Sequence, residues 1–195
     1  STVAYVMYQK YVNSIPLNRQ ETDWKQLGVK IPRATLANWV IKCGIDYMEP
    51  VYGQLHRHLL ERDIIHADET PCQVLKEEGK TAQSKSYMWL YGSGNDDLPP
   101  IRLYDYQPSR GGYHAEEFLK GFSGYLICDG FGGYNKLKNV IRCGCLAHMR
   151  RYWHEALPGK SKKSPDKTPA EIGFDYCNQL FKLEKEYADL DADTR

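Results

Sequence analysis

Long apolar runs are missing from this 195-residue sequence. No stretch approaches the roughly 18 consecutive apolar residues of a membrane-spanning helix, so no contact with a membrane is predicted. The first residues, Ser1 to Tyr5, lack the basic and then apolar pattern of a secretory signal peptide, and position 1 is not Met, which suggests a piece of a longer protein. The six cysteines are scattered along a chain too long to need disulfide bonds. These absences predict a protein of the reduced cytoplasm.

Net charge is also nearly absent, at +1, but the charge is unevenly distributed. Residues 130–169 carry nine Lys or Arg against two acidic residues, a net charge of +7. Residues 1–46 carry a net +3, and residues 170–195 a net −4. Two separate basic regions fit a polyanionic partner such as nucleic acid, although an uneven solvated surface gives the same pattern. The hydrophobic content of 42% supports a folded core and excludes global disorder.

Helical periodicity dominates the first 60 residues. Val3, Val6 and Met7 recur at the spacing of an amphipathic helix. Further helices are predicted over 18–27 with Gly28 as the stop, over 32–42 with Pro32 in the first turn and an end near Gly44, and over about 46–60, started or interrupted at Pro50.

The helices over 18–27 and 32–42 are joined by a short segment that begins at Gly28, a layout typical of a helix-turn-helix. The second helix of such a motif presents its early side chains to a DNA groove. Arg33, Thr35 and Asn38 are therefore the predicted DNA contacts. An ordinary helical hairpin that binds nothing shows the same pattern.

From residue 64 the period changes to that of strands. Strands are predicted over 64–68, 86–91, 101–106, 124–129 and 140–145, and helices over 114–119 and 146–157. This order indicates an α/β fold with a mixed sheet flanked by helices. Residues 158–169 read as a flexible basic linker, followed by a long amphipathic helix over 171–190.

Two aspartates, Asp68 and Asp129, each follow an apolar strand. If the two strands are neighbours, the carboxylates converge, and a converging pair needs a cation to neutralise it. Hard oxygen ligands favour Mg²⁺ or Mn²⁺, and two such ions can support phosphodiester chemistry. The alternative is that both aspartates serve as caps or turn residues.

Several ordered motifs make the chain similar to a known family. They are HADETP at 66–71, YMW at 87–89, YDYQPSR at 104–110, FLKGFSGYL at 118–126, DGFGGYN at 129–135 and CLAHMRR at 145–151. With the upstream stretch from Tyr8 to Val40, they resemble the insertion sequence 66 family of bacterial DDE transposases along essentially the whole chain.

The resemblance implies a ribonuclease-H-like core that uses two Asp and one Glu with Mg²⁺ or Mn²⁺. Asp68 and Asp129 take the places of the two Asp residues. The family's Glu lies in an Asp-Asn-Asn-x-x-Glu-Arg motif that this sequence lacks, so we expect it beyond Arg195. The expected organisation is a helix-turn-helix-like segment over 1–60, a partial catalytic core over 61–157, the linker over 158–169 and the start of a helical insertion over 170–195.

The implied activity is metal-dependent DNA strand cleavage and strand transfer at transposon ends. The expected partner is double-stranded DNA, both transposon ends and target, and a homo-oligomer in the active complex is left open. Two alternatives remain: a DNA-binding module whose catalytic core is truncated or inactive, and a metal-dependent nuclease of the same fold.

The predicted helix after Cys145 is basic and follows the second Asp. His148 and Arg151 lie three residues apart and share one face, and with Arg150 they are predicted DNA contacts. Cys143, Cys145 and His148 also invite a zinc interpretation, but the paired Cys-x-x-Cys half-sites of structural zinc are absent.

Overall fold

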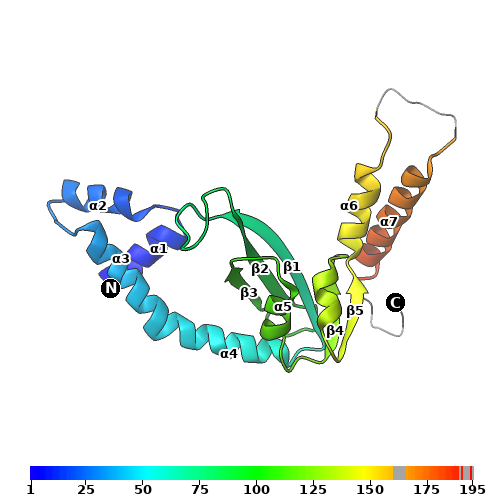
Figure 1. The fold of residues 1–195 in the computed structure, drawn as a ribbon, viewed down its shortest axis with the longest axis horizontal. Helices are drawn as coiled ribbons and strands as arrows, with labels where there is room; N and C mark the ends of the chain where they lie inside the picture. Colours follow the sequence, from blue (N-terminus) through cyan, green and yellow to red (C-terminus); the bar gives the residue numbers. More distant parts are fainter. Residues whose placement is uncertain (160–165, 189, 191–193, 195) are drawn as a thin grey trace. The chain divides into compact units, whose positions relative to one another are not determined.

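A computed structural model describes residues 1–159, 166–188, 190 and 194 (Figure 1). The chain divides into two compact units, Ser1–His58 and Leu59–Arg195, and each is described by itself. Half of the predicted linker, residues 160–165, lies outside the described residues. Within the described part, we find no helix with the length and apolar character needed to cross a membrane.

The first unit is helical. Its elements are α1 (Thr2–Tyr11), α2 (Leu17–Gln26), α3 (Arg33–Cys43), the π-helical turn η1 (Gly44–Met48) and α4 (Glu49–Leu60), which runs past the unit boundary. Val6, Leu36 and Val40 form its buried core, against which Trp24 and Trp39 pack. The apolar core comes from α1 and α3, and α2 contributes Leu17 and Trp24 at its edge. The buried Gln20 of α2 also donates from Nε2 to the carbonyl of Val6 on α1 over 3.3 Å.

The prediction that Gly28 ends the second helix is confirmed. Gly28 has a φ of +81°, its N–H donates to the carbonyl of Lys25, and the N–H of Val29 donates to the carbonyl of Trp24. These two bonds form a Schellman motif, in which glycine tolerates the left-handed conformation and the last helical carbonyls are satisfied.

The prediction that the third helix ends near Gly44 is confirmed, since α3 ends at Cys43 with Gly44 at its C-cap, but the helical continuation beyond Gly44 was not predicted. Gly44 keeps helical dihedrals, with φ −56° and ψ −55°, and the chain continues through the π-helical turn into α4. A glycine stops a helix when it takes a positive φ, and here it does not. An ion pair of 3.0 Å between Lys42 and Asp46 spans the junction, and Pro50 is tolerated in the first turn of α4.

The second unit is built on a five-stranded mixed sheet. Its elements are β1 (Ile64–Gln73), β2 (Lys85–Ser93), β3 (Arg102–Gln107), α5 (Gly112–Phe118), β4 (Gly124–Cys128), the 3₁₀-helix η2 (Gly132–Lys136), β5 (Val140–Gly144), α6 (Leu146–Glu155) and α7 (Pro169–Glu186). The strand order is β3-β2-β1-β4-β5, where β1 to β3 form an antiparallel meander and β4 and β5 run parallel to β1. This is a ribonuclease-H-like sheet, as predicted.

The two faces of β1 have different environments. Ala67 and Glu69 are buried and lie opposite Tyr91 and Trp89 of β2. On this face Tyr91 stacks on Phe118 of α5, with ring centroids 3.8 Å apart. His66 and Asp68 are exposed and share the other face of the sheet, because side chains alternate along a strand.

The prediction that Asp68 ends its strand is wrong, because β1 continues to Gln73. Beyond His66 the strand pairs only with β2, up to Gln73 opposite Lys85, so this stretch is an edge of the sheet. Pro71, which normally indicates a strand end, is tolerated there because one side of an edge strand needs no hydrogen-bond donor.

Helices α6 and α7 pack side by side (Figure 1). The guanidinium of Arg150 lies 4.6 Å from the ring centroid of Phe174, and its Nε donates to Asn178 Oδ1 over 2.6 Å. Gly173 faces the indole of Trp153, where a Cβ atom would lie 2.6 Å from the ring. Thr168 and Glu171 form a capping box, so Pro169, the last residue of the predicted linker, is already helical.

Candidate active site

The two predicted catalytic aspartates lie on neighbouring parallel strands. Strands β1 and β4 pair in parallel, and their last pair is His66 opposite Ile127. Asp68 and Asp129 each stand two residues beyond that pair, Asp68 within β1 and Asp129 directly after β4. The prediction that the two strands are adjacent is confirmed, while a cation shared by the two carboxylates stays a prediction.

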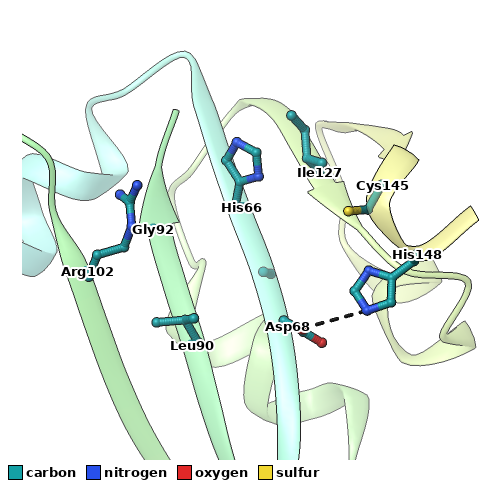
Figure 2. A pocket seen from close by; sticks show the side chains of 9 residues that line it. His66, Asp68, Leu90, Gly92, Arg102, Ile127, Cys145 and His148 are labelled. Carbon is teal, nitrogen blue, oxygen red and sulfur yellow. Dashed lines mark ion pairs between the residues drawn. The ribbon is translucent and has the colours of Figure 1, made fainter. Parts of the chain in front are cut away.

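Asp68 faces the open side of the sheet. Its side chain is 52% exposed, and Oδ2 lies 3.8 Å from His148 Nε2 of α6 (Figure 2). Its Oδ1 accepts the backbone N–H of Glu69 over 2.9 Å. At least one carboxylate oxygen of Asp68 is therefore accessible to a substrate or cation.

Asp129 is more enclosed, with a side chain that is 14% exposed. Its Oδ1 accepts the backbone N–H of Phe131 over 2.8 Å, and its Oδ2 lies 3.7 Å from Arg110 Nη2. The first contact is an Asx-type turn that fixes the loop after β4. The second places a cation beside the carboxylate.

Sequence reasoning missed a buried network next to Asp129. The carboxylate of Glu69 is fully buried, and it accepts Arg110 Nη2 over 2.5 Å, Arg110 Nε over 2.7 Å and the Tyr134 hydroxyl over 2.6 Å. Arg110 also lies 4.2 Å from the ring centroid of Phe131. The network ties β1 to the loop before α5 and to η2. The signal available in the sequence was the alternation along β1, which turns Glu69 toward the core, where a carboxylate requires a partner.

The charges in this network shift the pKa of its members. Burial opposes ionisation of Arg110, but its hydrogen bond to Glu69 and the nearby charges of Glu69 and Asp129 raise the pKa of the guanidinium. Burial and then Glu69 raise the pKa of the Tyr134 hydroxyl. Both groups therefore stay protonated donors at neutral pH.

A pocket of about 280 Å³ opens around Asp68 on the exposed face of the sheet (Figure 2). Its lining comes from four strands and from the start of α6, and comprises His66, Ala67, Asp68, Leu90, Gly92, Arg102, Ile127, Cys145 and His148. Burial, and next the charge of Arg102, lower the pKa of His66. An acidic side chain, two imidazoles and a guanidinium thus border one cavity.

The donor set suits a hard cation only in part. Asp68 and Asp129 offer carboxylate oxygens, the ligands that Mg²⁺ and Mn²⁺ prefer. Across residues 1–159 and 166–188, no three His, Cys, Asp or Glu side chains are grouped to hold a metal ion. That finding includes Cys143, Cys145 and His148, which form no such group.

The predicted DNA contacts lie in both units. In α3, Arg33 and Asn38 are exposed and Thr35 is half-buried. The backbone N–H of Arg33 donates to Glu21 Oε1 over 2.8 Å, which ties the start of α3 to α2.

In α6, Arg151 is exposed, whereas Arg150 is engaged with α7 and His148 faces Asp68. The structure thus brings His148 to Asp68. DNA contacts by any of these residues stay predictions.

The strand order and the position of Asp68 and Asp129 define a ribonuclease-H-like protein with its acidic residues where β1 and β4 separate. All 195 residues match the transposase IS66 family, and the chain belongs to this family, as its motifs indicate.

Three proteins of Sinorhizobium fredii are similar to the chain: the uncharacterized proteins y4qI, y4hP and y4jD, at 29%, 24% and 26% identity over 99%, 99% and 98% of this chain. The chain spans 37%, 38% and 39% of the length of these relatives. No solved structure gives a significant match.

Proposed function

We propose that this chain carries the first two catalytic carboxylates, Asp68 and Asp129, of a DDE transposase that cleaves DNA at transposon ends and transfers the cut strand. The observation that supports this most directly is the matched position of the two aspartates, each two residues beyond the last β1–β4 pair. Membership of the IS66 transposase family supplies the substrate class.

In this proposal Asp68 and Asp129 bind Mg²⁺ or Mn²⁺. When bound, such ions activate a water or 3′-hydroxyl and stabilise the leaving oxygen of a phosphodiester. Asp129 is held for this role by the N–H of Phe131 and by Arg110. Asp68 stays half-exposed, and His148 beside it supplies a donor for a phosphate oxygen or for Asp68 itself.

DNA binding is assigned to both basic regions. Arg33, Thr35 and Asn38 on α3 contact duplex DNA, and Arg151 on the exposed side of α6 contacts the strand near Asp68. Such contacts neutralise phosphates, so binding weakens steeply as salt rises.

The test is strand cleavage and strand transfer by the complete gene product on transposon-end DNA with Mg²⁺ or Mn²⁺. Asp68→Asn and Asp129→Asn should each lower the rate by roughly 10³-fold, because metal-bound carboxylates support several kcal/mol of transition-state stabilisation. Asp63→Asn is the matched control, since Asp63 is exposed and directly precedes β1. Full activity of Asp68→Asn would contradict the proposal.

A second candidate function is DNA binding without catalysis by these 195 residues alone. The observation that favours it is that the described residues supply two carboxylates but no third donor grouped for a metal. Strand cleavage by the isolated chain should then be negligible while DNA binding persists. Cleavage that disappears in Asp68→Ala would show that the chain already holds a sufficient third ligand, and Glu155 on α6 would be the first residue to test.

A further inference from the structure

One transverse row of the sheet places a guanidinium and an imidazole beside Asp68. Arg102 of β3 pairs with Gly92 of β2, Gly92 pairs with His66 of β1, and His66 pairs with Ile127 of β4. Directly paired residues present their side chains on the same face. Arg102 and His66 therefore share the open face that carries Asp68 two residues further along β1 (Figure 2).

Gly92 makes this arrangement possible. A Cβ atom at Gly92 would lie 2.8 Å from Arg102 Cδ and 3.1 Å from its Nε, so the arginine side chain occupies the space that a side chain on β2 would fill. Arg102 thus lies across β2 on the pocket side.

The guanidinium of Arg102 is anchored on one side. Its Nη1 donates to the carbonyls of Ser93 over 3.0 Å and of Ile101 over 2.8 Å. Within the described chain, Arg102 Nε and Nη2 make no hydrogen bond, so its remaining donors are available to the pocket. A fixed guanidinium with spare donors is suited to a phosphate, whose oxygens accept charge-assisted hydrogen bonds.

The dimensions suit one nucleotide unit. The cavity of about 280 Å³ lies near the lower end of the roughly 300–1,000 Å³ seen for small-ligand pockets, too small for a duplex. Two residues along a strand cover about 7 Å, comparable to the step between successive phosphates of a nucleic-acid strand. A DNA strand that runs along β1 with its reacting phosphate at Asp68 therefore brings a neighbouring phosphate to His66, and Arg102 of β3 reaches toward the same row over Gly92.

We propose that Arg102 and His66 form a subsite for the DNA backbone phosphate adjacent to the one positioned at Asp68. Arg102 reaches this phosphate because Gly92 has no side chain that would block it. This inference rests on the proposed function for the location of the reacting phosphate. Binding at the subsite itself requires no metal and no cleavage.

The experiment is a binding scan in EDTA with the complete gene product. Single-stranded transposon-end oligonucleotides carry one neutral methylphosphonate at each position in turn. One position should weaken binding by wild-type protein about tenfold, as expected for the loss of a charge-assisted contact. In Arg102→Gln that sensitivity should vanish at the same position and persist elsewhere. Arg102→Lys should restore part of it.

Two further variants separate a phosphate contact from general effects. Gly92→Ala should imitate Arg102→Gln, because the added methyl displaces the arginine, and a thermal melt confirms that the variant is folded. Lys120→Gln removes an exposed cation that does not line the pocket and should leave the scan unchanged.

A scan in which Arg102→Gln keeps every sensitivity of the wild type overturns the subsite. If Arg102→Gln keeps every sensitivity but Asp68→Asn loses cleavage, the proposed function stands and only the subsite is rejected. If Arg102→Gln loses the sensitivity at one methylphosphonate position but the wild-type protein never cleaves DNA, the subsite is supported and the proposed function is rejected.

Discussion

Removal of the Tyr134 hydroxyl tests whether the buried carboxylate of Glu69 holds the sheet and the loop after β4 together. Tyr134 donates to Glu69 Oε2 over 2.6 Å, and both side chains are buried. Burial and Glu69 raise the pKa of this hydroxyl, so it stays protonated at neutral pH. Tyr134→Phe deletes this donor and keeps the ring that packs edge-on against Trp89, with centroids 6.0 Å apart.

The structure sets the expected magnitude. A hydrogen bond to a charged group stabilises by about 1.5–3 kcal/mol, and Glu69 keeps Arg110 as a partner in this variant. We therefore expect Tyr134→Phe to lower the free energy of unfolding of the sheet unit by about 2 kcal/mol.

Arg110→Met removes the counter-charge of a fully buried carboxylate, which costs about 3–5 kcal/mol. The lower end applies because the guanidinium itself is 42% exposed and its interaction is partly screened. Arg110→Met should therefore lower the free energy of unfolding more than Tyr134→Phe does.

The assay is equilibrium urea unfolding. Hydrogen exchange of the β1 amides confirms that the measured transition is the unfolding of the sheet unit. Tyr125→Phe is the matched control, because Tyr125 on β4 is 48% exposed and its hydroxyl should contribute less than about 0.5 kcal/mol. Equal stabilities of Tyr134→Phe and Tyr125→Phe would refute the reasoning, since the buried hydrogen bond would then contribute nothing.

Three further predictions concern metal, pH and DNA. The isolated chain should bind Mn²⁺ only at about 1 mM or weaker, since the site is incomplete, and Asp68→Asn should weaken that binding in an EPR titration; unchanged affinity would exclude Asp68 as a ligand. Burial lowers the pKa of His114 from 6.5, against the opposing charge of Asp105, so the unfolded chain gains the proton first on acidification. Unfolding free energy should thus fall from pH 7.5 to 5.5, less so in His114→Gln, and equal slopes would contradict this. Arg33→Ala should weaken duplex binding and lower its salt slope by about one, and identical titrations would remove Arg33 from the interface.

The sequence predicted the order of strands and helices in the sheet unit because strand periodicity and turn residues are local signals. It misjudged the end of β1 because proline breaks a strand only where the strand is paired on both sides, and at Pro71 one side of β1 is unpaired. It predicted the end of α3 near Gly44 but missed the continuation into η1, because a glycine's φ depends on whether the next turn packs as a helix. It missed the Glu69–Arg110–Tyr134 network entirely, since these residues lie 41 and 65 positions from Glu69 and only the folded sheet brings them together.

Asp68 and Glu69 show how one strand gives consecutive carboxylates opposite roles. The strand period turns Asp68 to the open face, half-exposed beside a histidine, and turns Glu69 into the core at 0% exposure. A buried carboxylate is destabilising unless it is paired and hydrogen-bonded, and Glu69 meets that condition through Arg110 and Tyr134. Arg110 Nη2 also lies 3.7 Å from Asp129 Oδ2. The arginine that neutralises the buried Glu69 therefore also places a positive charge beside Asp129. Because Arg110 already offsets part of the negative charge of Asp129, a cation shared with Asp68 would be held more weakly than by two unpaired carboxylates. The same core contact therefore both positions the proposed site and limits its affinity for metal.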